Sequence, residues 1–365
     1  MDGDGFQEIL TWDWHFLTFP GSGTWDASEA TLRTIEMDVG VYAEPRAVTD
    51  LDADGVSELV WWDDLGSYGD LNVDAFDVPR FAYGAAHVWS DQLDYSTCYY
   101  GYCPEVYVVP DVTGDGAADL EYSWTHWEGN PEEYVDYLRP PTSDTPDWQM
   151  TRTPSITGYM SVRRGVNDLD GDGLDDAVLV SWDVLVMAGP LSDPPGGDIS
   201  ANLDGDLDAH GPDNDAGDAR SGDVEGDGYG DLIVTAWAGE RGDSQVLLVV
   251  SGPIHDGDLR GSAVAELGVA GEDLFTALDV ADADGDGRVD ILARGWSVQQ
   301  SESVTAVFRA PLCGSVGVAN ADARWASGGG GASGDARWIE DRDDDGVREF
   351  ILAGDDTFFV LQPPF

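Results

Sequence analysis

A short acidic loop recurs seven times along this chain of 365 residues, and no other feature constrains the fold as strongly. A complete copy has acidic residues at positions 1, 3, 5 and 9 and glycine at position 6. The position-6 glycines are Gly5, Gly55, Gly116, Gly173, Gly228, Gly287 and Gly346, at intervals of 50 to 61 residues. Regular repetition at this length indicates one small supersecondary unit repeated in tandem.

The loops supply the candidate metal ligands. In chain order these are Asp2, Asp4 and Glu8; Asp50, Asp52, Asp54 and Glu58; Asp111, Thr113, Asp115 and Asp119; Asp168, Asp170, Asp172 and Asp176; Asp223, Glu225, Asp227 and Asp231; Asp282, Asp284, Asp286 and Asp290; and Asp341, Asp343, Asp345 and Glu349. Two copies depart from the pattern. Position 1 of the first loop would precede Met1, and Thr113 replaces an acid in the third loop. We expect both loops to be weaker sites.

Carboxylates at this spacing place hard oxygen atoms around one point while the glycine takes a sharp turn, which is how proteins build calcium loops. A helical EF-hand loop would also need a bidentate glutamate at position 12. That position instead holds residues such as Trp61, Leu179 and Ala293. The pattern therefore predicts up to seven structural calcium ions, in loops that are not EF-hands.

An alternative interpretation is that these are ordinary acidic turns, because aspartate and glycine both favour turns without any metal. Four carboxylates in one turn repel one another unless a cation is present. We therefore favour metal binding for the complete loops.

Each loop runs into a strand-like segment, so the predicted fold is all-β. The sixth repeat shows this clearly, with apolar stretches at residues 275–280, 290–293 and 303–308. Four strands in each repeat, apolar on both faces, are typical of sheets that pack face to face. Seven four-stranded antiparallel blades in a circle form a β-propeller, and we predict one such domain over residues 1–365.

The loop followed by an aliphatic strand, as in residues 275–292, resembles the FG-GAP and VCBS repeats of integrin alpha subunit propellers and their bacterial relatives. The resemblance covers the whole chain. The Phe-Gly and Gly-Ala-Pro signatures of that family are degenerate, and the nearest remnants are Ala353-Gly354 and Ala188-Gly189-Pro190. The resemblance implies a calcium-containing propeller.

The chain begins inside its first loop and ends with the second strand after its seventh. We therefore expect the first blade to lack its inner strand and the last blade to lack its outer strand. An upstream segment would supply both, and this predicts an N-terminal truncation with a signal peptide upstream of Met1.

The net charge of −55, from 72 acidic and 17 basic residues, excludes nucleic acid and anionic membranes as partners. The apolar runs are strand-sized, so we expect no membrane insertion. Calcium loops of extracellular modules need about 0.1 to 1 mM calcium, which favours a secreted or cell-surface protein, a monomer or part of a larger chain. A disulfide between Cys98 and Cys103 would fit that compartment, and we expect Cys313 to be a small buried thiol.

A ligand would bind on the face opposite the calcium loops. Two aromatic and polar stretches, residues 95–104 and 125–133, are expected there. Their candidate contact residues are Tyr99, Tyr100, Tyr102, His126 and Trp127. Exposed aromatic rings can stack on sugars or contact a protein. The alternative is that these rings pack beneath long loops.

No nucleophile elbow, phosphate-binding loop, zinc-protease motif or pair of cysteine ligands occurs, and the five histidines are scattered. We therefore predict that the chain is not an enzyme. The predicted function is an extracellular adhesion or ligand-recognition module with a protein or glycan partner. The alternatives are a lectin-like carbohydrate binder and a polysaccharide-degrading lyase or hydrolase.

Overall fold

The computed structural model covers the chain, with strands described throughout and most loops described in its second half. The described residues are 9–10, 15–18, 31–34, 43–49, 58–64, 71–77, 87–93, 105–112, 114, 116, 118–126, 132–138, 148–152, 162–166, 168–180, 183–190, 203–208, 216–238, 244–268, 273–297, 302–327, 336–339, 341, 345–353 and 358–363. Among them the only helices are α1 (Leu259–Ser262) and the 3₁₀ turn η4 (Val318–Asn320). The prediction of an all-β fold is confirmed at this level.

The chain forms two compact units. The first comprises Met1–Thr18, Thr31–Gly158 and Gly189–Asn202, and the second comprises Phe19–Ala30, Tyr159–Ala188 and Leu203–Phe365. A single domain over residues 1–365 stays a prediction.

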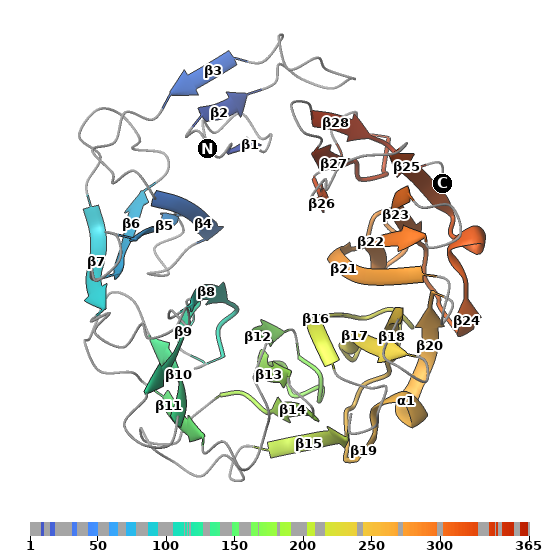
Figure 1. Cartoon of the computed structure of the whole chain (residues 1–365), viewed down its shortest axis with the longest axis horizontal. Coiled ribbons are helices and arrows are strands. Elements are labelled where there is room, and N and C mark those ends of the chain that lie inside the picture. The colour runs from blue at the N-terminus through green and yellow to red at the C-terminus, as the bar shows by residue number, and fades with distance from the viewer. Residues whose placement is uncertain are drawn as a thin grey trace. The chain divides into compact units, whose positions relative to one another are not determined.

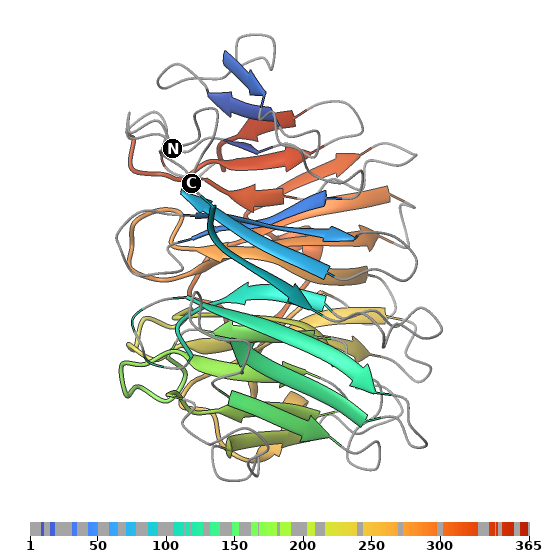
Figure 2. The same ribbon diagram turned by 90° about the vertical axis from the view of Figure 1, so that its left-hand side faces the viewer.

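The first unit contains three antiparallel sheets (Figure 1). In order, their strands are β1 (Ile9–Leu10), β2 (His15–Thr18) and β3 (Thr31–Thr34); β4 (Ala43–Thr49), β5 (Glu58–Asp64), β6 (Leu71–Asp77) and β7 (His87–Leu93); and β8 (Glu105–Val109), β9 (Asp119–His126), β10 (Glu132–Leu138) and β11 (Trp148–Arg152). Each sheet is a meander in which consecutive strands pair (Figure 2). The first strands of the two four-stranded sheets, β4 and β8, contact each other.

The second unit contains three four-stranded meanders and one with three described strands. Its strands are β12 (Val162–Val166), β13 (Asp176–Val180), β14 (Asp183–Met187) and β15 (Leu203–Asp208); β16 (Ala216–Gly222), β17 (Asp231–Ala238), β18 (Ser244–Val250) and β20 (Ala263–Leu267); β21 (Asp273–Ala281), β22 (Asp290–Ser297), β23 (Glu302–Phe308) and β25 (Ala323–Ser327); and β26 (Ala336–Trp338), β27 (Phe350–Ala353) and β28 (Phe358–Leu361). The strands predicted in the sixth repeat correspond to β21, β22 and β23, so that prediction is confirmed.

Two short strands lie between the third and fourth strands of two of these meanders in the sequence. β19 (Gly257–Asp258) pairs in parallel with β15, and β24 (Gly314–Val316) pairs in parallel with β20. Each short strand comes from one repeat and pairs with the outer strand of the preceding repeat. These two pairings connect the fourth strand of one meander to a segment of the next meander in the chain.

The sheets of the second unit pack face to face through their apolar side chains. In β17, Leu232 and Val234 belong to the core shared with β13 and β14, whereas Ile233 belongs to the core shared with β22 and β23. Successive side chains of a strand point to opposite faces, so a strand buried on both sides needs a continuous apolar run. The first strands β12, β16, β21 and β26 contact one another in that order.

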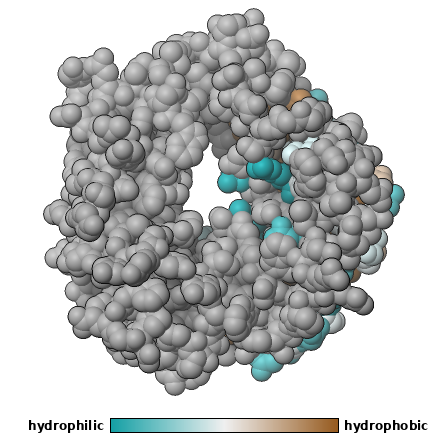
Figure 3. Space-filling view, in the orientation of Figure 1, coloured by the Kyte–Doolittle hydropathy of each residue, from teal (hydrophilic) through white to brown (hydrophobic). Residues whose placement is uncertain are grey.

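The first and last meanders each contain three described strands, and these lack the first and the fourth position respectively. The described residues visible in Figure 3 are mostly hydrophilic, as expected for an acidic chain. Within the described part of the chain, no helix has the length and apolar character needed to cross a lipid bilayer.

Phe350 anchors the last meander. Its side chain is fully buried and contacts the rings of Trp325 and Trp338 edge-on, with centroid distances of 4.6 and 5.6 Å. We expect Phe350→Ala to lower the free energy of unfolding by about 3–5 kcal/mol, because it removes this contact and leaves a cavity. Urea unfolding followed by tryptophan fluorescence measures the loss. Phe350→Leu keeps most of the apolar volume and should cost less than half as much; equal midpoints for wild type and Phe350→Ala would contradict the assignment.

Candidate metal centres

The aspartate at position 1 organises each described loop. In the fourth loop, residues 168–176, Asp168 Oδ1 accepts hydrogen bonds from the backbone N–H groups of Gly171 at 2.5 Å and Asp172 at 3.1 Å. Asp168 Oδ2 accepts from the Gly173 N–H at 2.7 Å. Equivalent bonds to the position-6 glycine are made by Asp111, Asp223, Asp282 and Asp341. One side chain therefore curls the loop around its own carboxylate.

Two glycines of the fourth loop have a left-handed backbone conformation. The position-6 residue Gly173 has φ +90°, and the position-4 residue Gly171 has φ +86°. Residues with a Cβ avoid this left-handed region. From the sequence we predicted a turn at position 6 alone, although glycine also occupies position 4 in the first loop and in the third to sixth loops.

The acids at positions 3 and 5 each use one oxygen to hold the loop. Asp170 Oδ1 accepts from the Asp172 N–H at 2.9 Å, and Asp172 Oδ1 accepts from the Leu174 N–H at 2.9 Å. In the sixth loop, residues 282–290, Asp284 and Asp286 make the same two kinds of bond. Fixing one oxygen restricts the orientation of the whole carboxylate.

The acid at position 9 is buried and closes the loop onto the sheet. Asp176 Oδ2 accepts from the Leu169 N–H at 2.7 Å, and Asp290 Oδ2 accepts from the Ala283 N–H at 3.1 Å. Burial raises the pKa of the Asp231 and Asp290 carboxyl groups, in the case of Asp290 to about 6. Desolvation disfavours the charged form, and the backbone hydrogen bonds offset this only in part.

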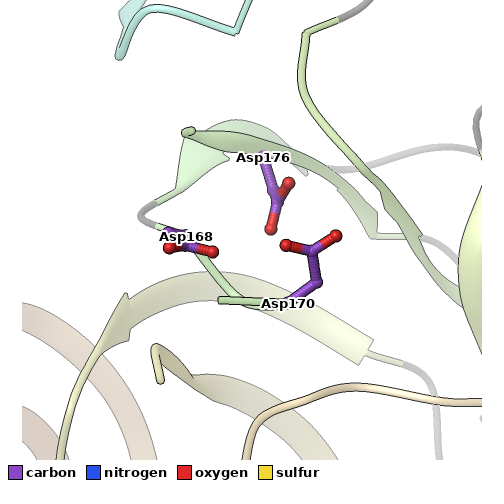
Figure 4. A group of neighbouring side chains, drawn as sticks. All are labelled: Asp168, Asp170 and Asp176. Carbon is purple, nitrogen blue, oxygen red and sulfur yellow. The ribbon is translucent and has the colours of Figure 1, made fainter. Parts of the chain in front are cut away.

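Two groups of carboxylates converge closely enough to hold a metal ion. Oxygen atoms of Asp168, Asp170 and Asp176 lie within 4.8 Å of one another, and Figure 4 shows the three groups facing a common point. Oxygen atoms of Asp282, Asp284 and Asp286 lie within the same distance. Like charges at this spacing repel, and a cation between them removes the repulsion.

The donor chemistry of these groups fits calcium. The ligand atoms that converge in them are carboxylate oxygens. Hard oxygen donors from several carboxylates are the ligands that calcium prefers. Each group can therefore hold a hard divalent cation.

Successive loops of the second unit are bonded to each other. The Gly230 N–H donates to the Asp168 carbonyl and the Val289 N–H donates to the Asp223 carbonyl, both at 2.8 Å. At the side-chain level, the Tyr229 ring of the fifth loop covers Gly171 of the fourth. Ordering of one loop thus supports the loop before it.

The remaining predicted ligands lie partly outside the described residues. Those outside are Asp2, Asp4, Glu8, Asp50, Asp52, Asp54, Thr113, Asp115 and Asp343. Glu58 begins β5, and Asp119 begins β9 with its Oδ2 accepting from the Val112 N–H at 2.8 Å. In the fifth loop, Glu225 accepts from the Ser251 hydroxyl at 2.7 Å.

The predicted ligand face and disulfide fall mainly on residues that the structure does not describe. Tyr99, Tyr100, Tyr102, Trp127, Cys98 and Cys103 lie outside the described residues. His126 ends strand β9. The expectation that Cys313 is buried was wrong: this free cysteine is exposed, in the segment between the third strand of the sixth repeat and β24.

Comparison with known proteins shows no family for this chain. No family model matches it, and no curated protein matches it. Similar solved structures include BBS1N in complex with ARL6DN, at TM-score 0.48 and 11% identity, covering 93% of this chain and 84% of that one. They also include a Synechocystis apocarotenoid oxygenase mutant, at 0.43 and 13%, covering 88% and 71%. The Pseudomonas aeruginosa PilY1 C-terminal domain matches at 0.39 and 11%, covering 98% and 78%.

The prediction that the chain is not an enzyme is corrected by these comparisons, because apocarotenoid oxygenase is among the similar structures. The prediction came from the absence of short catalytic motifs. Catalytic groups can be contributed by separate repeats, so they leave no contiguous motif, and one fold supports many functions. The similarity assigns no reaction to this chain.

Substitutions at the two loop glycines should separate backbone strain from the contact between loops. Gly171→Ala and Gly173→Ala both place a Cβ at positive φ, at a cost of about 1–2 kcal/mol. Only the Cβ at position 171 would also collide with the Tyr229 ring, because nothing lies within 4 Å of the one at position 173. We expect Gly171→Ala to destabilise the protein more in thermal unfolding, and Tyr229→Ala to remove the difference. A difference that persists in the Tyr229→Ala background would contradict the contact.

The stability of the calcium-free protein should depend on the Asp290 carboxyl. Its pKa in the folded protein, about 6, lies above the usual aspartate value of 3.8. Its contribution to stability is therefore fully present below pH 3.8 and is lost as the pH rises through about 6. We expect Asp290→Asn to reduce the pH dependence of the urea midpoint, measured with chelator between pH 4 and 6.5. Parallel profiles for Asp290→Asn and wild type would show that another group carries this dependence.

Proposed function

We propose that the chain is a calcium-stabilised, seven-bladed β-propeller that acts as an extracellular ligand-recognition module. The observation that carries the calcium assignment is the convergence of Asp168, Asp170 and Asp176 within 4.8 Å. Three carboxylates held at one point by backbone hydrogen bonds have little reason to converge without a cation.

The propeller assignment is supported by the repeated meanders and by their packing. Consecutive first strands contact one another in the second unit, and the sheets bury both faces. Blades of a propeller pack in this way around a central axis. The further proposal is that the meanders of both units together close into one ring of seven blades.

Calcium has a structural role in this proposal. In the second unit, the acidic loops join the first strand of a meander to the second, and the backbones of the fifth, sixth and seventh loops each donate a hydrogen bond to the preceding loop. Neutralising the carboxylates would therefore stabilise the connections within and between blades. Binding of a protein or glycan partner would then depend on calcium even if the calcium ion does not touch that partner.

The recognition role is supported by the separation of the two ends of each meander. Strand β9 runs from the loop acid Asp119 to His126, about 23 Å away at 3.3 Å per residue. Its hairpin to β10 therefore lies at the opposite end from the acidic loop. We propose that the predicted aromatic residues contact an extracellular protein or a glycan at this end. A lectin-like binder and a polysaccharide lyase or hydrolase are the other candidates.

Calcium should raise the unfolding temperature of the protein. A site at a free calcium concentration of 100 times its dissociation constant contributes about 2.7 kcal/mol. We expect a higher midpoint in millimolar calcium than in chelator, and a smaller calcium effect in Asp168→Ala. Asp256→Ala is the matched control, because Asp256 is an exposed acid outside the loops. Identical midpoints with and without calcium would refute the calcium assignment.

Recognition should be detectable on a panel of glycans and polysaccharides, measured in millimolar calcium and again in chelator. Calcium-dependent binding that weakens in Tyr100→Ala and Trp127→Ala would place the site on the predicted face. Loss of polysaccharide chain length, abolished by His126→Ala, would indicate an enzyme. A blank panel with folded protein would favour a protein ligand. Binding unchanged in all three variants would show that the site lies elsewhere.

A further inference from the structure

A short turn follows the third strand of three successive meanders. The turns are Ala188-Gly189-Pro190 after β14, Ser251-Gly252-Pro253 after β18 and Arg309-Ala310-Pro311 after β23. The three differ most in chemistry at their first residue: alanine, serine or arginine.

The backbone of this turn is attached to the acidic loop. The Gly252 N–H donates to Asp231 Oδ1 at 3.0 Å, and the Ala310 N–H donates to Asp290 Oδ1 at 2.9 Å. The second residue of the turn is thus held by the position-9 acid in both repeats. This attachment fixes the first residue of the turn beside the loop.

The first residue of the turn contacts the acid at position 3 wherever its side chain is polar. The Ser251 hydroxyl donates to Glu225 Oε2 at 2.7 Å. The Arg309 guanidinium forms an ion pair with Asp284 through Nη2 and Oδ2. Ala188 in the fourth repeat has no polar atom with which to make this contact.

The oxygen that Arg309 meets belongs to the candidate metal centre. Asp284 has a side chain that is only 6% exposed, and its Oδ2 is the oxygen that pairs with Arg309. The Asp284 carboxylate also belongs to the cluster with Asp282 and Asp286. A buried carboxylate oxygen needs a positive partner, which can be either a metal ion or a guanidinium.

Arg288 adds a second positive charge to the same loop. Its Nη1 lies 3.4 Å from Asp286 Oδ2. The corresponding position 7 is Leu174 in the fourth loop and Tyr229 in the fifth. The acids at positions 3 and 5 of the sixth loop therefore both face an arginine.

We propose that Arg309 is a tethered cation that competes with calcium in the sixth loop and sets its affinity below that of the fourth. This inference rests on the proposed calcium function. The first residue of the turn after the third strand thereby determines the strength of each site, in the order alanine, serine, arginine. The Arg309 side chain is 43% exposed, so its head group can move into solvent when calcium binds.

The test is a calcium titration by calorimetry, with bound ions counted by native mass spectrometry. Arg309→Ala removes the competing charge and should tighten binding at one site by about tenfold. Arg309→Met, which keeps the apolar stem, should do the same and covers the case in which the alanine variant fails to fold. Arg324→Ala is the matched control, because it removes an exposed arginine from β25 of the same sheet.

Two further variants assign the effect to the sixth loop. The tightening should vanish when Asp282→Ala is combined with Arg309→Met, because the site itself is then lost. The reverse substitution, Ala188→Arg, should weaken one site by about tenfold. Equal tightening in Arg324→Ala would show a general charge effect and would overturn the proposal.

The outcomes separate this inference from the proposed function. Wild-type protein that binds no calcium at millimolar concentration contradicts the proposed function. Wild-type protein that binds calcium, with the same affinities in Arg309→Met and Ala188→Arg, contradicts the role of Arg309 and leaves the calcium function standing.

Discussion

The structure depends on carboxylates that are brought closer together than their charges favour. In the fourth loop, Asp168 folds the backbone around its own side chain while Asp170 and Asp176 converge on the same point. Repulsion among such groups is reduced by protonation, by an arginine or by a metal ion. Different loops reduce this repulsion in different ways. Burial favours the protonated form of Asp290, and Arg309 pairs with Asp284.

These loops also connect the sheets. Backbone hydrogen bonds join the fifth loop to the fourth and the sixth to the fifth. Buried apolar runs such as 246–250 fill the space between adjacent sheets. The apolar contacts provide most of the burial, whereas the loops fix how each meander meets the next. A cation in one loop would therefore affect the order of its neighbours.

Much of the fold was predictable because the repeat carries its own markers. The acid at position 9 marks the start of β13, β17 and β22, and the apolar runs after it mark strands buried on both faces. The contact of Arg309 with Asp284 was not predictable, because it joins a loop and a turn that are separated in the sequence by β22 and β23. The left-handed conformation of Gly171 was indicated by the recurrence of glycine at position 4, but we predicted a turn only at position 6. Cys313 was predicted to be buried but is exposed. Apolar neighbours in the sequence do not show whether a turn residue is buried.

The central claim is that these loops are calcium sites, and anomalous diffraction from crystals grown in millimolar calcium tests it most directly. The account predicts an anomalous peak between Asp168, Asp170 and Asp176, with oxygen atoms about 2.3–2.6 Å from it. A well-ordered fourth loop that shows only water at this point would contradict the account.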